Sequence, residues 1–216
     1  MTSLWSLAQE RKQPDFQYMD QETLDQIQAK KPEFSHEGVS FDLDQSDIDL
    51  LLDLSPKEDW YLEPKIVSSI HGIAHTCRVM LYAYLLVKDE VNLEELKAIL
   101  FACSIHDTQR LDDKGDEGHE VRALEWLKEN FHKHESFNLV YQILEGTHDN
   151  EKYLRTADAL DRYRLPKVKW WIDDSYLSIK PKESFKVFAF NLILCSEQKI
   201  LNGSDPKTSI LDCLAI

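Results

Sequence analysis

Residues 65–87, KIVSSIHGIAHTCRVMLYAYLLV, restrict the possible folds of this chain more than any other segment. Apolar side chains recur at helical spacing there, and they are too numerous for a helix with one face in solvent. We therefore expect a central helix that other elements cover on most sides. The segment also carries His71, His75 and Arg78, whose burial is costly unless polar partners reach them.

Further helical patterns flank this segment in the sequence. They cover residues 92–107, 118–134, 136–148, 150–165 and 182–203. Asn92 and Ser136 are the expected N-caps of two of these helices, and Pro166 ends a third. The chain is therefore predicted to be all-α, a bundle of about six or seven helices.

Two regions depart from the bundle pattern. Residues 167–180, KVKWWIDDSYLSIK, break the helical period, and their aromatic and β-branched content predicts either a short hairpin or an ordered loop. Residues 1–60 are polar and interrupted by prolines, with shorter helical patterns after Asp20 and Ser46. We expect residues 1–60 to be an extension that packs on a helical domain of residues 61–216, which has at most a small β-hairpin insertion.

The formal charge of −14 over 216 residues argues against a nucleic acid duplex or an anionic membrane as the main partner. A small phosphorylated substrate is compatible with this charge, because bound cations reverse the local field. The sequence has neither a secretion signal nor a run of about 18 apolar residues that would span a membrane. Four widely spaced cysteines without a CxxC pair predict free thiols in a reducing compartment: Cys77, Cys103, Cys195 and Cys213. We expect a cytoplasmic protein.

Histidines and an aspartate cluster around two of the predicted helices. His71 and His75, four residues apart, are expected on one face of the central helix, with Arg78 one turn further. His106 and Asp107 end the next helix, and both bind one ion only if it lies beside the helix end. Neutral imidazole and carboxylate together suit Mn, Fe, Co, Ni or Zn, and Mg less well.

Three more candidate ligands follow along the chain. His119 opens one predicted helix, His148 closes another, and Asp158 lies in the middle of a third. Each has an ordinary alternative role: a polar first residue of a helix, a histidine favoured by the helix dipole, and a surface partner for Arg155 or Arg162. It is the order of these residues along the chain, rather than any one of them, that indicates a metal site.

This ordered set resembles the HD-domain superfamily of metal-dependent phosphohydrolases. The matching stretches lie within residues 68–165 and read HGIAHTCRV, AILFACSIHDTQRLDDKGDEGH, ILEGTHD and TADALDRYR. The resemblance implies that residues 61–216 form an HD-type helical bundle. It also implies four core metal ligands, with Asp158 preferred over Asp161 as the last of them. These ligands are His75, His106, Asp107 and Asp158.

Some members of the superfamily bind two metal ions. For such a site the resemblance implies two further ligands, here His119 and His148, with Asp107 between the ions. His71 resembles an earlier histidine present in some members, which supports the ligands or faces the substrate.

The resemblance implies hydrolysis of a phosphomonoester or a nucleotide with one or two divalent ions, chosen from Mn, Fe, Mg, Co, Ni and Zn. Such ions polarise phosphoryl oxygens and activate water. Asp107 is expected to orient the attacking water, and His71 to protonate the leaving oxygen. Arg162 and Arg164 are weaker candidates for phosphate binding, because nearby carboxylates can pair with them. The expected phosphate contacts are Arg78, Arg110 and Lys114.

Two other functions fit the same ligand set. One is a di-iron oxygenase of the same superfamily, for which iron content and oxygen-dependent turnover are expected. The other is a catalytically silent HD-fold module with a binding or regulatory role. That module predicts a protein without metal, whose function survives substitution of the ligands.

Overall fold

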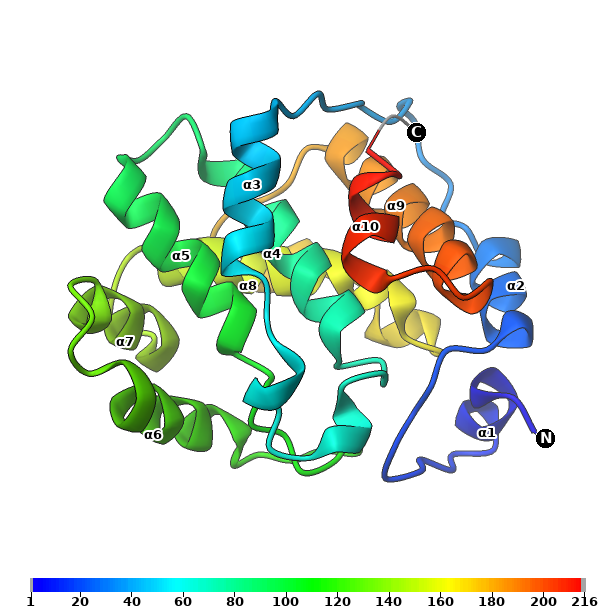
Figure 1. Cartoon of the computed structure of the whole chain (residues 1–216). Helices are drawn as coiled ribbons and strands as arrows, with labels where there is room; N and C mark the ends of the chain where they lie inside the picture. The colour runs from blue at the N-terminus through cyan, green and yellow to red at the C-terminus, as the bar shows by residue number, and fades with distance from the viewer. Residues whose placement is uncertain (1, 215–216) are drawn as a thin grey trace.

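The computed structural model describes residues 2–214. Within that range the chain forms ten α-helices and several short 3₁₀ turns, without a β-strand (Figure 1). The helices are α1 (Leu4–Gln9), α2 (Gln21–Ala29), α3 (Gln45–Leu54), α4 (Ile73–Val87), α5 (Leu93–Ile105), α6 (His119–Phe131), α7 (Phe137–Glu145), α8 (Glu151–Asp161), α9 (Glu183–Leu201) and α10 (Pro206–Leu211). The all-α prediction is confirmed. None of these helices is long and apolar enough to span a membrane.

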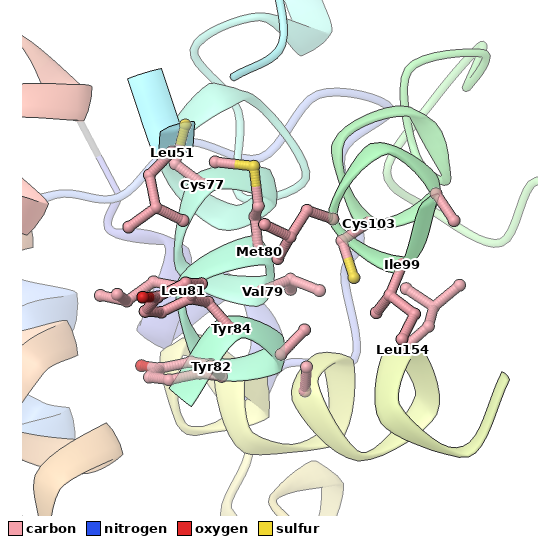
Figure 2. Packing of buried hydrophobic residues seen from close by; sticks show 14 of the residues in the cluster. Leu51, Cys77, Val79, Met80, Leu81, Tyr82, Tyr84, Ile99, Cys103 and Leu154 are labelled. Atoms are coloured by element: carbon pink, nitrogen blue, oxygen red, sulfur yellow. The ribbon is translucent and has the colours of Figure 1, made fainter. Parts of the chain in front are cut away.

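Helix α4 is central, as its apolar pattern predicts. It packs against α5, α8 and α10, and most of its side chains are buried. Figure 2 shows part of this core, in which Val79 of α4 points towards Ile99 of α5 and Leu154 of α8, while Met80 points towards Leu51 of α3. The packing holds α4, α5 and α8 in fixed positions relative to one another, and these three helices carry most of the candidate ligands.

The start of α4 differs from the sequence prediction. The helix begins at Ile73, and the residues before it fold into a tight turn. A Cβ atom on Gly72 would lie 2.2 Å from the carbonyl oxygen of Val67 and 2.3 Å from that of Ile66, so only glycine fits there. His71 therefore lies in the turn rather than on the helix, and the expected helical face shared by His71 and His75 is wrong.

The ends of the other helices follow local capping chemistry. Asn92 caps α5 as predicted, because its side chain accepts the backbone N–H of Glu95 at 3.0 Å in a capping box. Helix α3 begins before the predicted Ser46, because Asp44 caps it with a bond to the backbone N–H of Asp47. Ser136 precedes α7 but makes no side-chain capping bond.

The region 167–180 is an ordered loop. It contains two 3₁₀ turns, Val168–Trp170 and Asp174–Tyr176, and no hairpin forms in this described stretch. Trp171 anchors the loop in a second apolar cluster, where it packs with Ile27 of α2 and Phe190 of α9. The same cluster attaches the N-terminal segment to the rest of the chain.

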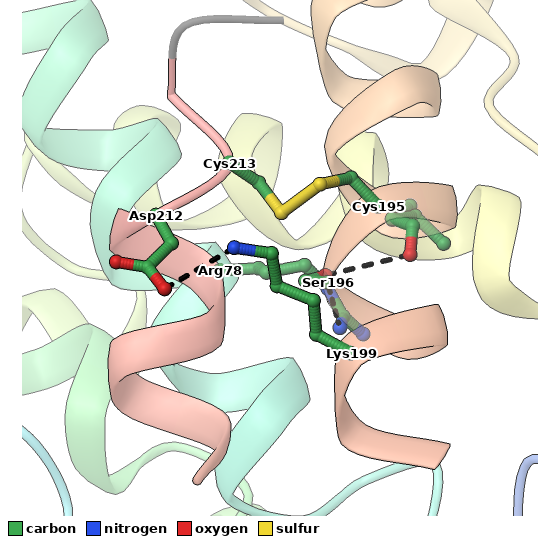
Figure 3. Close-up of a disulfide and its surroundings, with 7 residues drawn as sticks. Arg78, Cys195, Ser196, Lys199, Asp212 and Cys213 are labelled. Carbon is green, nitrogen blue, oxygen red and sulfur yellow. Dashed lines mark hydrogen bonds and ion pairs between the residues drawn. A yellow bond between two sulfur atoms is a disulfide. The ribbon is translucent and has the colours of Figure 1, made fainter. Parts of the chain in front are cut away.

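The cysteine prediction is partly wrong. Cys77 and Cys103 are free and buried, but Cys195 and Cys213 form a disulfide. This bond joins α9 to the residues that follow α10 (Figure 3). The spacing of the cysteines does not predict this pairing, because Cys195 and Cys213 are brought together by the packing of α10 against α9, which the spacing alone does not show.

Candidate metal centre

The ends of α4, α5 and α8 meet around a group of imidazoles and carboxylates, of which His75 and Asp107 are buried and His106 and Asp158 are partly exposed. His75 lies in the first turn of α4, His106 and Asp107 follow the last residue of α5, and Asp158 lies on α8. The Nε2 atom of His75 is 3.2 Å from Oδ2 of Asp107 and 3.4 Å from Oδ1 of Asp158. The Nε2 atom of His106 is 3.8 Å from Oδ2 of Asp107.

Two overlapping triads have the spacing of a metal site. One contains His71, His75 and Asp107, and the other contains His75, His106 and Asp158. Within each triad the ligand atoms lie within 4.8 Å of one another. Both triads can therefore hold a metal ion.

The hydrogen bonds of the imidazoles fix which nitrogen faces the centre. The Nδ1 atom of His75 donates to Oδ2 of Asp161 at 2.8 Å, and that of His106 donates to the carbonyl oxygen of Cys103 at 2.7 Å. In a neutral imidazole the other nitrogen, Nε2, then carries a lone pair. Both Nε2 atoms are buried and have no hydrogen-bond partner among residues 2–214.

These lone pairs are the structural reason to place a cation here. A buried acceptor without a donor costs free energy, and here two such acceptors lie next to carboxylate oxygens. A metal ion would relieve this unfavourable arrangement, because it would bind the nitrogen and oxygen lone pairs together. Imidazoles whose Nδ1–H is held by a carboxylate or a carbonyl are the usual form of histidine ligands.

Asp107 lies at the middle of the group and is almost fully buried. Its Oδ2 atom is 2.8 Å from Nδ1 of His71, while its Oδ1 atom is 2.9 Å from Nε of Arg110 and 3.3 Å from Nε2 of His119. Burial alone would raise the pKa of Asp107, but Arg110 and the imidazoles outweigh it and hold the pKa well below its usual range. The carboxylate is therefore ionised at neutral pH.

A buried ion network supports His75 from behind. Asp161 accepts bonds from Nε and Nη2 of Arg78 at 2.6 and 3.2 Å, besides the bond from His75. Burial opposes ionisation of Asp161, but the guanidinium of Arg78 and the imidazole of His75 lower its pKa to about 2. Arg78 also donates to Glu197 of α9 at 2.6 Å.

Arg78 therefore does not lie where a substrate would reach it. The sequence suggests a phosphate contact, but the guanidinium is fully buried and its nitrogens bond to Asp161, Ser196 and Glu197. This network explains how α4 carries an arginine in the core without an uncompensated charge.

A cavity of about 420 Å³ opens beside the ligands. Four cationic side chains contribute to its wall, namely Arg110, Lys114, Arg162 and Arg164. Lys114 is exposed and pairs with Asp15 at 2.7 Å. Arg162 is exposed and donates through Nε to the carbonyl oxygen of Trp170 at 2.7 Å. Four carboxylates line the same cavity, namely Asp107, Asp113, Glu120 and Asp158. The cations therefore suit an anionic ligand once a metal ion offsets the carboxylates beside the imidazoles.

Arg164 is buried at the base of the cavity. Its Nε donates to the carbonyl oxygen of Ile70 at 2.5 Å, and its Nη2 lies 3.2 Å from Nδ1 of His71. Burial lowers the pKa of His71 to about 3, although its bond to Asp107 acts in the opposite direction. His71 is therefore neutral at pH 7, which argues against the proton-donor role expected from the sequence.

The six expected ligands are not all brought together. His119 reaches Asp107 with Nε2, while its Nδ1 donates to the carbonyl oxygen of Asp116. His148 is part of neither triad and does not line the cavity in the described structure. Its Nδ1 accepts the backbone N–H of Asn150 at 3.1 Å, so His148 caps the turn that leads into α8.

Sequence reasoning missed the role of Asp161. The sequence suggests Asp161 only as an alternative to Asp158 as a ligand, whereas the structure uses both: Asp158 faces Nε2 of His75, and Asp161 accepts a hydrogen bond from Nδ1. Their spacing of three residues on α8 places them on the same side of the helix, which is the signal that was available.

Neither a model of a known protein family, nor a curated protein, nor a solved structure matches this chain. The functional conclusion therefore depends on the arrangement of its own side chains.

Proposed function

We propose that this protein is a metal-dependent phosphohydrolase of the HD-domain type, which hydrolyses a phosphate ester of a small molecule. The main support is the pair of buried, unpartnered Nε2 atoms of His75 and His106, which lie beside the carboxylates of Asp107 and Asp158. The order of these ligands, a histidine on α4, His-Asp at the end of α5 and an aspartate on α8, supports the HD type.

The donor set also limits the ion. Two imidazole nitrogens and two carboxylate oxygens suit Mn, Fe, Co, Ni or Zn better than Mg or Ca. When bound, such an ion supplies Lewis-acid polarisation of a phosphoryl oxygen and activation of water. One ion on His75, His106, Asp107 and Asp158 is the simplest occupancy, because His148 belongs to neither triad of the described residues.

The chain's own residues bind and orient the substrate. In the proposed reaction water attacks phosphorus, a new P–O bond forms, the ester P–O bond breaks, and inorganic phosphate and an alcohol leave. Negative charge on the phosphoryl oxygens is stabilised by fixed cations. Arg110 is held in the wall by Asp107 at 2.9 Å, and Arg162 lines the same cavity with only its Nε hydrogen-bonded in the described structure. We therefore assign phosphate binding to Arg110 and Arg162.

Other residues position these groups. Asp161 keeps the proton of His75 on Nδ1, so that Nε2 faces the centre. His71 contacts Asp107 and limits its movement, and Arg164 in turn contacts His71. Because these contacts are buried, the ligand atoms keep their arrangement without the metal.

Phosphate release under metal loading tests the proposal. The purified protein is loaded with Mn, Co, Ni, Zn, Fe or Mg and assayed with p-nitrophenyl phosphate and a panel of phosphorylated metabolites. We expect turnover with at least one ion, and His106→Ala should lower kcat/KM by more than about 100-fold. The matched control is His132→Ala, since His132 is exposed and lies outside the cavity.

Two results would overturn the proposal. If His106→Ala keeps the turnover of the wild type, the proposed metal ligands take no part in the reaction. Iron-dependent oxygen consumption without phosphate release would instead support the oxygenase alternative.

A further inference from the structure

A second cavity adjoins the one at the metal centre. It has a volume of about 810 Å³, and it shares Gln13 and Trp170 with the first cavity. Its wall comes from α1, the chain after α1, the end of α2 and the 3₁₀ turn Val168–Trp170. A molecule bound at the metal centre therefore has an adjoining space into which a further group can extend.

The second cavity is strongly basic. Four cations line it, namely Arg11, Lys30, Lys167 and Lys169, and no carboxylate of the described chain lines it. The protein as a whole carries a charge of −14, so this concentration of positive charge is unusual for its surface. None of the four cations forms an ion pair within residues 2–214, whereas Lys114, Lys186 and Lys199 do.

The positive charges of Lys169 and Arg11 repel that of Lys167. Lys167 is the least exposed of them, and burial together with the nearby charges of Lys169 and Arg11 lowers its pKa. Like charges held close together without a counter-charge destabilise the protein, and a bound anion offsets that cost. The arrangement is therefore suited to an anionic group.

The cavity is built from fixed parts. Gln9 of α1 donates to the carbonyl oxygen of Pro166 at 3.2 Å, which ties α1 to the turn that carries Lys167. The Nζ atom of Lys167 lies 4.3 Å from the centre of the Trp170 ring. Arg162, which lines the first cavity, donates to the carbonyl oxygen of Trp170. Trp170 thus links the two cavities directly.

We propose that the second cavity binds a second anionic group of the substrate, so that the substrate is a small polyanion such as a bisphosphate. The inference extends the proposed function: the phosphate that is cleaved lies at the metal centre, and the other lies among Arg11, Lys30, Lys167 and Lys169. A small molecule is favoured over a polynucleotide, because the overall charge of −14 repels a long phosphate backbone.

Binding without metal tests this subsite separately from hydrolysis. Isothermal titration calorimetry is carried out in a chelating buffer of low ionic strength, with adenosine 5′-monophosphate and adenosine 3′,5′-bisphosphate as probes. We expect the bisphosphate to bind about tenfold more tightly. Lys167→Glu combined with Lys169→Glu should abolish this difference, so that the double variant binds the bisphosphate no more tightly than the monophosphate.

The matched control is Lys97→Glu combined with Lys133→Glu, which changes the net charge equally at exposed positions away from both cavities. This control should keep the preference. Equal affinity of the two probes for the wild type, or loss of the preference in the control, would overturn the subsite. Tighter binding of a single-stranded oligothymidylate than of the bisphosphate would overturn the choice of a small molecule.

Failure of the subsite and failure of the proposed function are distinguishable. If the probes bind equally but hydrolysis depends on His106, only the subsite is wrong. If the bisphosphate preference is present and no ion supports phosphate release, only the proposed function is wrong.

Discussion

Substituting asparagine for Asp161 tests the metal centre without changing any atom that would touch the ion. In the wild type Asp161 is fully buried and accepts a hydrogen bond from Nδ1 of His75. An asparagine in the same place donates from its amide to that nitrogen, because its oxygen is needed by Arg78. The proton of His75 then moves to Nε2, which no longer offers a lone pair to a metal ion.

The size of the effect follows from the same contacts. Loss of a carboxylate or carbonyl behind a histidine ligand weakens metal binding by about 10- to 100-fold. Stability falls as well, because Arg78 and Arg164 are buried beside Asp161 and both lose its negative charge, which leaves Arg78 with Glu197 alone. Breaking a buried ion pair costs about 3–5 kcal/mol, and the asparagine keeps the volume and one acceptor, so we expect about 3 kcal/mol.

The pH dependence of stability gives a second estimate. The folded pKa of Asp161 is about 2, below its ordinary value of 3.8, so ionisation of this group stabilises the folded protein above pH 4. The contribution is about 2–3 kcal/mol and is lost as the pH falls through 2. The stability difference between wild type and Asp161→Asn should therefore be largest above pH 4 and should shrink towards pH 2.

Two assays check this prediction. Competition with a chromophoric chelator gives the affinity for Mn or Zn, and urea unfolding followed by circular dichroism gives the free energy of unfolding. Asp53→Asn is the control, since Asp53 is exposed on α3. Wild-type metal affinity in Asp161→Asn, or a loss of stability below about 1 kcal/mol, would refute the reasoning.

Three further predictions concern stability, each measured by urea unfolding. Burial raises the pKa of Asp113 to about 6, so ionisation of this carboxyl destabilises the folded state. Between pH 4 and pH 8 the free energy of unfolding of the wild type should therefore fall by up to about 3 kcal/mol relative to that of Asp113→Asn. Parallel pH profiles of the two proteins would contradict this. The disulfide joins Cys195 and Cys213 across a sequence separation of 18 residues, so Cys195→Ser should lower the free energy of unfolding by about 3 kcal/mol. A reductant should then destabilise only the wild type. Gly72→Ala should lower the free energy of unfolding by at least about 2 kcal/mol, because the new Cβ would overlap two carbonyl oxygens. Wild-type stability of this variant would contradict the close approach of Gly72 to those oxygens.

Much of the fold follows from local sequence features. The apolar pattern of residues 65–87 predicts the central position of α4, and Asn92 predicts the start of α5. The start of α4 at Ile73 was missed, because the close approach of Gly72 to the preceding carbonyls has no signature in hydrophobic periodicity. Helices α1 and α10 were missed because six residues are too few for a periodic pattern.

The candidate site, like the fold, is predicted from the sequence only in part. The order of His75, His106-Asp107 and Asp158 along the chain indicates which residues meet, and the structure brings them together. The sequence does not reveal that Arg78 pairs with Asp161 inside the protein, or that His148 bonds the backbone of the turn before α8. Both facts depend on side-chain direction, which is set by packing between helices rather than by spacing along one of them.

The central claim is that one metal ion binds between α4, α5 and α8. The most direct test is a crystal structure of the protein grown with Mn²⁺ and an anomalous difference map recorded from it. We predict a peak about 2.0–2.4 Å from Nε2 of His75, Nε2 of His106 and the nearest carboxylate oxygens of Asp107 and Asp158. A fully loaded crystal with no peak among these four side chains would contradict the account.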